Sequence, residues 1–255
     1  MLASLDPRLL IGFLLALTRV SGIVALVPFP GLRNGPEPAR ILFALTMTWC
    51  LRPAWPPPPD IMPGLATLSL WILAEATFGV TVGLFVSFLL EAFQVGAQML
   101  SVQAGYSYAS TVDPNTQADS GVVVVIIQLM SGLCFFAAGL DREILAAVGR
   151  SFHTIPPGSF VINARSIAAV TQTGSLMIST GLRIAMPVIA FLLLVDLALA
   201  LLGRVQSQLQ LLSLAFPAKM LASLLLLSSL AALFPAVFES TAHRTIAALG
   251  AVLGG

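Results

Sequence analysis

The sequence predicts an all-α protein built from membrane-associated helical hairpins. Of its 255 residues, 58% are hydrophobic and 9% are charged, and the mean hydropathy is +0.98. Soluble globular domains carry about 25% charged residues, so this composition indicates a chain that is surrounded largely by lipid or by other apolar helices. The apolar residues also form long runs separated by turns rich in proline and glycine, which is typical of helices that cross or enter a membrane.

Charge and the chemically reactive side chains argue against several classes of function. The formal net charge is +1 and no basic patch is present, so we expect no nucleic-acid partner. Cys50 and Cys134 lie singly inside apolar runs, which fits buried small side chains better than a disulfide or a metal site. His153 and His243 are far apart, and no Gly-x-Ser-x-Gly elbow occurs. We therefore expect no metal, no cofactor and no enzyme activity.

The first part of the chain predicts one span and one shorter apolar helix. Leu9–Val27 is apolar for about the 20 residues that a bilayer crossing needs, with Arg19 as its only charge. The run Ile41–Leu51 is too short to span alone, so it is either half of a hairpin or a span that borrows its flanks. Arg52–Pro63 contains four consecutive prolines and predicts a stiff, extended linker.

The segment Gly64–Ala104 contains no proline and predicts one long helix. At the usual rise it would measure about 60 Å, twice the thickness of a hydrocarbon core. Gly79 and Gly83 are four residues apart, so they form a small-residue face on which another helix can approach closely.

A polar stripe follows on the same predicted helix. Gln94, Gln98 and Ser101 obey the i, i+4, i+7 spacing of one helix face and lead toward Gly105. From the residues alone, this stripe faces water, a pore or polar groups of a partner.

The segment Gly105–Ser120 is a polar interruption of the apolar chain. It holds both tyrosines and two acidic residues, and it contains no lysine or arginine. Proline lacks an amide donor and disfavours helical geometry in the residue before it, so the turn at Asp113-Pro114 cannot continue the helix. The segment is therefore a loop. It is either a solvated connector, which is the commoner case, or a loop that lines or gates a pore.

The second half of the chain predicts further helical runs separated by turns. In order, they are a span over Val122–Leu140, a helix over Asp141–Phe152 that Ile155–Gly158 ends, a Ser- and Thr-rich helix over Asn163–Thr180, a span over Ile184–Leu202, an apolar run over Leu211–Phe234, and a small helix after Pro235.

Three ionisable residues, Arg19, Glu75 and Asp196, are predicted to be buried. They lie within apolar helices, where an unpaired charge is costly. Such residues either form a proton or ion relay or pair between helices, and pairing is the commoner use. Basic residues are almost evenly divided between the two sides of alternating spans, so they do not fix a topology.

A set of short motifs occurs in a fixed order along nearly the whole chain. They are Arg19-xx-Gly22, Pro28, Gly31, Pro36-xxx-Arg40, Glu75 with Gly79 and Gly83, Gly96-Ala-Gln98, Gln103-Ala-Gly105, Asp113-Pro114, Ser151-Phe152, Pro157-Gly158, Ala185-Met-Pro187, Asp196, Gly203-Arg204 and Phe216-Pro217-Ala-Lys219. This ordered set resembles the FliR/SctT family of export-gate subunits of type III secretion systems, and the flagellar branch more than the injectisome branch.

The resemblance implies a structural, channel-forming subunit that is packed in a helical export-gate assembly. Its expected partners are homologues of FliP and FliQ, the export components FlhB and FlhA, membrane lipid, and secreted unfolded proteins including proximal rod components. Its expected location is the bacterial inner membrane, in the flagellar basal body. Residues 1–160 would form FliP-like hairpins and residues 161–255 a FliQ-like hairpin.

The resemblance also assigns roles to particular residues. It implies that the loop at residues 105–120 projects into the channel and plugs it, with Gly105, Tyr106, Tyr108, Asp113 and Pro114 as the candidate plug residues. Pore lining or subunit contact is expected of Gln94, Gln98, Ser101 and Gln103, and helix packing of Gly79 and Gly83. The alternative function is a stand-alone proton-coupled secondary transporter that uses Glu75 and Asp196.

Overall fold

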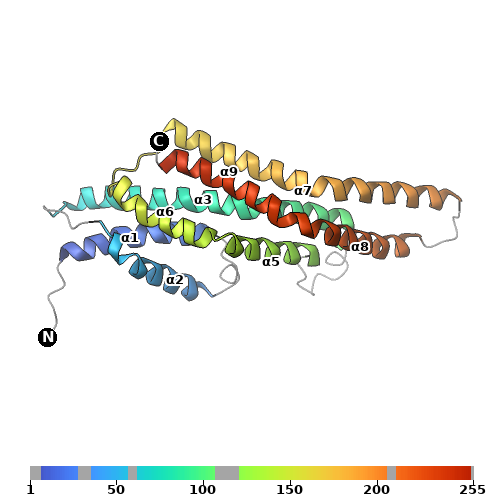
Figure 1. The fold of residues 1–255 in the computed structure, drawn as a ribbon, viewed down its shortest axis with the longest axis horizontal. Coiled ribbons are helices and arrows are strands. Elements are labelled where there is room, and N and C mark those ends of the chain that lie inside the picture. The colour runs from blue at the N-terminus through green and yellow to red at the C-terminus, as the bar shows by residue number, and fades with distance from the viewer. Residues whose placement is uncertain (1–6, 28–35, 57–61, 107–120, 206–210, 254–255) are drawn as a thin grey trace. The chain divides into compact units, whose positions relative to one another are not determined.

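The computed structural model describes residues 7–27, 36–56, 62–106, 121–205 and 211–253. These residues form helices and turns, and no strand occurs among them, which confirms the predicted all-α fold (Figure 1). The chain divides into two compact units, and each unit combines segments that are distant in sequence. Unit one consists of Met1–Phe88, Phe135–Thr173 and His243–Gly255, and unit two of Leu89–Cys134 and Gly174–Ala242. The predicted division cuts the chain once, into hairpins over 1–160 and 161–255, whereas each compact unit combines several segments. The predicted hairpins stay a prediction.

Unit one is formed mainly by the N-terminal helices and by the helix over Leu140–Thr154. Its helical segments are α1 (Pro7–Leu26), α2 (Glu37–Cys50), the short 3-10 turn η1 (Arg52–Ala54), the first part of α3 (Leu65–Ala104), the last residues of α5 (Val122–Ala137), α6 (Leu140–Thr154), the beginning of α7 (Ala164–Val205) and the end of α9 (Phe234–Leu253). The helices α1 and α2 pack against each other (Figure 1).

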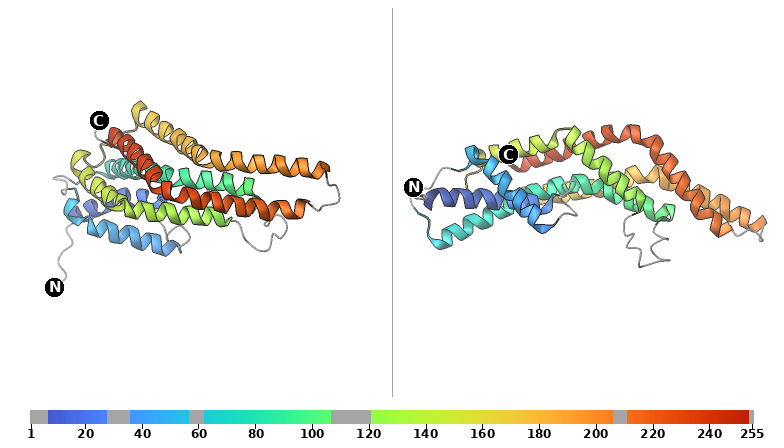
Figure 2. Two further views of the ribbon diagram at one scale, coloured as in Figure 1. Left: turned by 45° about the vertical axis from the view of Figure 1, so that its right-hand side comes forward. Right: turned by 90° about the horizontal axis from the view of Figure 1, so that it is seen from below.

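Unit two contains the end of α3 and most of the C-terminal helices. Its segments are the end of α3, most of α5 (Val122–Ala137), the later part of α7, α8 (Leu211–Leu230), the 3-10 turn η3 (Ala231–Leu233) and the beginning of α9 (Phe234–Leu253). Figure 2 shows α8 continuing into α9 through η3. Pro235 lies at the start of α9, where a missing amide hydrogen leaves no helical bond unmade.

In unit two, the backbones of α3 and α7 are in close contact where the two helices cross. A Cβ atom added to Gly96 would lie 2.8 Å from the carbonyl oxygen of Gly181, and one added to Gly181 would lie 2.7 Å from the carbonyl oxygen of Ala92. Next to this crossing, the ring of Phe93 packs on that of Phe238 with centroids 5.2 Å apart. Only residues without a side chain permit so close a crossing, and the aromatic rings fill the space beside it.

Most predicted helices are confirmed, and α3 covers the expected forty residues. The predicted span Val122–Leu140 is wrong in its length. The helix α5 ends at Ala137, because Gly139 adopts the left-handed conformation with φ 69° and α6 starts after it. The stiff linker predicted over Arg52–Pro63 was wrong at its start, which forms η1, and residues 57–61 lie outside the described part of the chain.

The prediction of separate elements over 163–180 and 184–202 was also wrong. Both belong to α7, a continuous helix of 42 residues with Pro187 inside it. A proline removes one backbone hydrogen bond, and neighbouring helices can hold the rest of the helix in place.

Four helical segments are long and apolar enough to cross a membrane, and the bent pair α5 and α6 could supply a fifth. The helix α2, with 14 residues, is too short to do so alone, as its sequence predicts. In the most apolar window of α7, 17% is buried within the chain, against 50% in α3. The apolar side chains of α7 therefore need lipid or other protein helices around them.

Candidate functional site

The core of unit one contains a buried ion pair between Arg19 of α1 and Glu75 of α3. Both side chains are 0% exposed. The Nε atom of Arg19 donates to Oε2 of Glu75, and Nη2 donates to Oε1 at 2.9 Å. Two parallel bonds of this kind are the strongest geometry available to an arginine and a carboxylate. The pair therefore joins two helices that are far apart in sequence.

The helix α6 and the turn after it supply the other hydrogen bonds of this pair. Nη1 of Arg19 donates to Ser151 Oγ at 2.9 Å, and Nη2 donates to the carbonyl oxygen of Ile155 at 3.3 Å. The backbone N–H of Gly158 donates to Glu75 Oε1 at 3.2 Å. Buried charges persist when their hydrogen-bonding capacity is filled in this way, so the pair also fixes α6 and residues 155–158.

Aromatic rings enclose the guanidinium group. Its carbon atom lies 4.3 Å from the ring centroid of Phe78 and 4.4 Å from that of Phe152. The ring of Phe160 meets Phe78 edge to face, with centroids 5.3 Å apart. A cation between two ring faces is stabilised by the negative charge density of those faces, and the rings also exclude water from the pair.

Glycine residues bring α1 and α3 close enough for the ion pair to form. A Cβ atom added to Gly79 would meet the carbonyl oxygen of Arg19 and would lie 3.1 Å from the Cα atom of Gly22. One added to Gly83 would lie 3.2 Å from the carbonyl oxygen of Gly22. Gly79 and Gly83, which the spacing predicts as a packing face, thus lie directly against α1, one and two turns from Glu75.

In unit two, the end of α3 forms the root of the predicted plug loop. Gly105 ends the helix in the left-handed conformation, with φ 86°, and its N–H donates to the carbonyl oxygen of Val102 at 3.1 Å. A Cβ atom on Gly105 would lie 2.7 Å from the ring of Phe216. Glycine is therefore required at this position both by the backbone conformation and by the space beside α8.

Tyr106 fastens this root to α8. Its hydroxyl group donates to the carbonyl oxygen of Met220 at 3.1 Å, and Ser223 Oγ lies 3.5 Å from the same hydroxyl. Pro217, three residues before Met220, lies inside α8. A proline lacks the backbone N–H and is a common cause of irregular hydrogen bonding in a helix. The hydroxyl group of Tyr106 bonds to a backbone carbonyl oxygen of α8 within one turn of this proline.

Asp196 of α7 holds the same root from another side. Gln103 Nε2 donates to Asp196 Oδ2 at 3.1 Å, and Lys219 Nζ lies 2.9 Å from Asp196 Oδ1. The three side chains come from α3, α7 and α8. The term loop root is used below for Gln103, Gly105, Tyr106, Asp196 and Lys219.

The predicted burial of ionisable residues is correct for Arg19 and Glu75 and wrong for Asp196. The side chain of Asp196 is 40% exposed, while that of Lys219 is 12% exposed. Unlike the pair in unit one, Asp196 lies on a helix of whose most apolar window 17% is buried within the chain.

The polar stripe of α3 is divided between buried and exposed positions. Gln94 and Ser101 are 5% and 4% exposed, whereas Gln98 is exposed and Gln103 is half-buried. The Ser101 side chain packs against the backbone of Gly121 at the start of α5. Packing within unit two thus uses part of the stripe. Tyr108, Asp113 and Pro114 lie outside the described residues.

Several contact residues at these sites carry no sequence signal. Ser151 and Gly158 contribute to the buried ion pair only because the fold brings them to it. Lys219 is 23 residues from Asp196, so no helical spacing indicates their pairing. The crossing at Gly96 could have been found from its spacing to Ala92, which repeats the small-residue pattern seen at Gly79 and Gly83.

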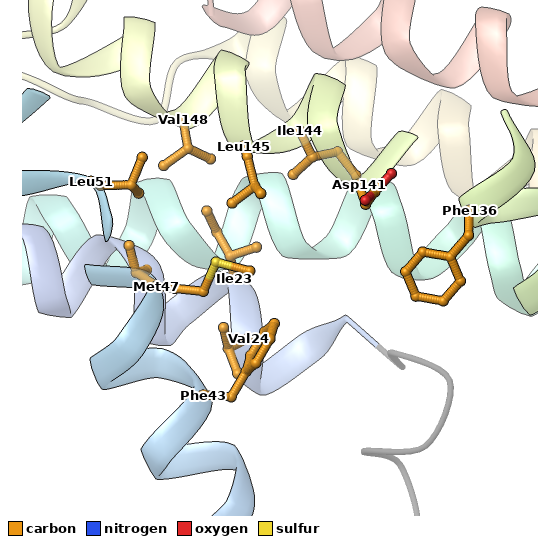
Figure 3. A pocket seen from close by; sticks show the side chains of 11 residues that line it. Ile23, Val24, Phe43, Met47, Leu51, Phe136, Asp141, Ile144, Leu145 and Val148 are labelled. Carbon is orange, nitrogen blue, oxygen red and sulfur yellow. The ribbon is translucent and has the colours of Figure 1, made fainter. Parts of the chain in front are cut away.

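A pocket of about 240 Å³ lies between α1, α2 and α6 in unit one (Figure 3). Met47 of α2 faces Leu145 and Val148 of α6 across it. Asp141, in the first turn of α6, is the one charged residue among those that line it. Within the described residues, no group of three or more His, Cys, Asp or Glu side chains could hold a metal ion.

The sequence pattern of the family described as "Bacterial export proteins, family 1" matches residues 10–245. This chain belongs to that family. The match includes both ends of the buried ion pair and the whole loop root.

Bacterial proteins named for flagellar biosynthesis are similar to this chain over most of their length. The flagellar biosynthetic protein FliR of Escherichia coli is 27% identical over 228 residues, which cover 89% of this chain and 85% of that protein. The proteins of the same name from Caulobacter vibrioides and Bacillus subtilis are each 27% identical over 218 residues, or 84% of this chain, and the match covers 86% and 84% of those proteins.

Membership of the export family, together with the apolar helices, indicates a membrane component of a bacterial export apparatus. None of these relatives bears the name of an enzyme. The alternative of a stand-alone proton-coupled transporter finds no support in the comparisons. The two carboxylates on which it relies lie in different units, and each already has a basic partner.

Proposed function

We propose that this chain is a structural, channel-forming subunit of the flagellar type III protein export gate. The observation that carries the proposal is its similarity to flagellar biosynthetic proteins FliR over more than four fifths of both chains. Its location would be the bacterial inner membrane, within the flagellar basal body. Unfolded export substrates, including proximal rod components, would pass through the channel to which it contributes.

In this proposal, the loop Gly105–Ser120 plugs the channel when no substrate is present. A plug needs a fixed base, since a loop with a mobile base could not return to one closed position. The loop root supports this role, because Gly105 packs on Phe216 and Tyr106 is bonded to α8. Tyr108, Asp113 and Pro114 would contribute the sealing surface, together with Tyr106.

The proposed partners are homologues of FliP and FliQ in the same assembly, and the export components FlhB and FlhA. The exposed apolar side chains of α7 and α8 support such an assembly, because they need an apolar cover that helices of neighbouring subunits can provide beside lipid. Gln98 is exposed and is the member of the polar stripe that would reach a neighbouring subunit or the pore. Residues 1–160 and 161–255 would form the FliP-like and FliQ-like hairpins.

Two experiments test the proposal at separate points. Affinity purification of the full chain, co-expressed with the FliP and FliQ homologues of the same genome, should recover all three proteins in one complex. Recovery of the chain alone, together with uptake of a small solute by liposomes containing only this chain, would overturn the assignment to an export gate.

The second experiment concerns the plug alone. Deletion of Tyr106–Ala118 should make the assembled complex conduct small ions, while the complex with the full chain stays closed. A deletion complex that assembles normally and is as tight as the full complex would reject the plug while leaving the export-gate assignment in place.

A further inference from the structure

Arg183 of α7 has a positive charge without a counter-charge in the described part of the chain. Its side chain is exposed, and no described residue accepts a hydrogen bond from it or forms an ion pair with it. Asp196, a second charge of α7 in unit two, is paired with Lys219. A charged side chain in an apolar helix calls for a partner, so Arg183 indicates a ligand of opposite charge from outside the chain.

The position of Arg183 along α7 is that of a residue at a membrane surface. The apolar run Ile184–Leu202 begins directly after it and is about 28 Å long at the rise of an α-helix, close to the thickness of a hydrocarbon core. Arg204 follows the other end of the run. Arginine side chains at the ends of a span extend to the level of the lipid phosphates.

A pocket of about 260 Å³ lies beside Arg183, on the side of the apolar run. Its floor is formed by Leu100 of α3, Ile127 of α5 and Val188 of α7, each 2% exposed. At its rim Leu233 is 60% exposed, so the pocket is open to the surroundings of the chain.

The pocket lies where two helical segments are irregular. Pro187 interrupts the bonding of α7 on one wall, and η3 separates α8 from α9 on another. Regular helices would pack ridge into groove at this place and leave less space. Of the described residues that line the pocket, all except Arg183 are apolar.

We propose that Arg183 and this pocket bind an anionic phospholipid. The guanidinium group would hold the phosphate of the headgroup, and an acyl chain would occupy the apolar pocket. A guanidinium matches the geometry of a phosphate, and the adjoining cavity offers only apolar contacts. Since none of the described residues that line this pocket is a carboxylate, they offer no acidic partner to the ammonium group of a zwitterionic headgroup, which favours a lipid with net negative charge.

The pocket in unit one provides an internal comparison. It has nearly the same volume, about 240 Å³, but its charged lining residue is Asp141, which repels a phosphate (Figure 3). If apolar space alone retained lipid, both pockets would retain it without regard to headgroup charge. The proposal assigns the preference for anionic lipid to the pocket at Arg183 only.

Native mass spectrometry of the delipidated full chain tests the site, with phosphatidylglycerol and phosphatidylethanolamine added in turn. The full chain should retain phosphatidylglycerol preferentially. Arg183→Gln should weaken this retention about tenfold or more, the usual effect of removing a charged hydrogen-bond donor. Arg183→Lys should restore part of it. Arg165→Gln, which removes an exposed arginine at the start of the same helix and outside the pocket, should leave it unchanged.

A second pair of variants tests the acyl-chain pocket with the charge intact. Ala231→Trp, which fills the pocket at Arg183, should reduce phosphatidylglycerol retention, and Leu145→Trp, which fills the other pocket, should not. Equal retention by Arg183→Gln and the full chain would overturn the proposal, as would displacement of the lipid by inorganic phosphate, which would indicate a site for soluble anions.

One further outcome would assign Arg183 to protein contact instead. If the full chain shows no preference for phosphatidylglycerol, and Arg183→Gln no longer copurifies with the FliP and FliQ homologues, the counter-charge is an acidic side chain of a neighbouring subunit. That result would reject the lipid site while leaving the proposed export function intact.

Discussion

Arg19 and Glu75 join α1 to α3 through a bidentate ion pair that no solvent reaches. Burying two charges is unfavourable unless their geometry and their other hydrogen bonds offset the lost hydration. Here Ser151 and Gly158 complete the set, so only one arrangement of α1, α3 and α6 satisfies every donor and acceptor. We therefore expect the pair to specify the register of these helices more than it adds to their net stability.

Removing one charge of the pair should destabilise unit one severely. Glu75→Gln leaves Arg19 buried without a counter-charge, and breaking a buried pair in this way costs about 3–5 kcal/mol. Chemical unfolding of the full chain in detergent micelles measures this cost. Glu143→Gln, an exposed change in the first turn of α6, serves as the control and should have little effect. Equal stability of both variants would contradict the structural role of the pair.

Replacing both charges by apolar side chains should be far less harmful. The double variant Arg19→Met, Glu75→Leu leaves no charge uncompensated, and such replacements are often neutral or stabilising. We expect it to fold and to support flagellar assembly at least in part, as measured by swimming in soft agar. A double variant that is stable but entirely non-motile would show that these charges act in transport, which is the role required by the proton-relay alternative.

The close contact of α1 and α3 should not tolerate even one methyl group. Gly79→Ala places a Cβ atom against the carbonyl oxygen of Arg19 and the backbone of Gly22, and overpacking of this kind costs about 1–3 kcal/mol. Gly250→Ala in α9 is the matched control, since nothing lies within 4 Å of its added Cβ atom. That change should be neutral or slightly stabilising, because alanine favours helices. Comparable unfolding midpoints for the two variants would show that the helices separate readily.

The sequence predicts those features of the fold that depend on local chemistry. The absence of proline predicts α3, and the spacing of Gly79 and Gly83 predicts a face for close helix contact. Features that depend on tertiary packing could not be predicted. Whether Pro187 ends a helix depends on the neighbours that hold both sides together, and α7 continues through it.

In the candidate sites too, the contacts that depend on tertiary packing could not be predicted from the sequence. Arg19 and Glu75 are recognisable as charges in apolar helices, but their partners in α6 follow from the fold alone. The pairing of Asp196 with Lys219 could not be predicted either, because the two residues belong to different helices whose contact no local pattern specifies.

The hydroxyl group of Tyr106 should hold the proposed plug in its closed position. Tyr106→Phe keeps the ring but removes the hydrogen bond to Met220, and a neutral bond of this type contributes about 0.5–1.5 kcal/mol. We expect the assembled gate to show a higher basal ion conductance in planar bilayers. Ser240→Ala, which removes a hydroxyl bonded only within α9, is the control. Unchanged conductance of the Tyr106→Phe complex would mean that this bond does not hold the loop.

The contact between Asp196 and Lys219 should strengthen when the chain enters its proposed assembly. In the isolated chain, 40% of the Asp196 side chain is exposed within the apolar run Ile184–Leu202. A charge placed there draws water toward itself, and ion pairs that water reaches contribute about 0.2–1 kcal/mol. Neighbouring subunits that cover α7 would remove this water and raise the effective strength of the pair. A double-mutant cycle with Asp196→Asn and Lys219→Met measures the coupling free energy, first in the isolated chain and then in the complex. Equal coupling in both states would show that Asp196 stays in contact with water after assembly, and would place this side of α7 outside the subunit interface.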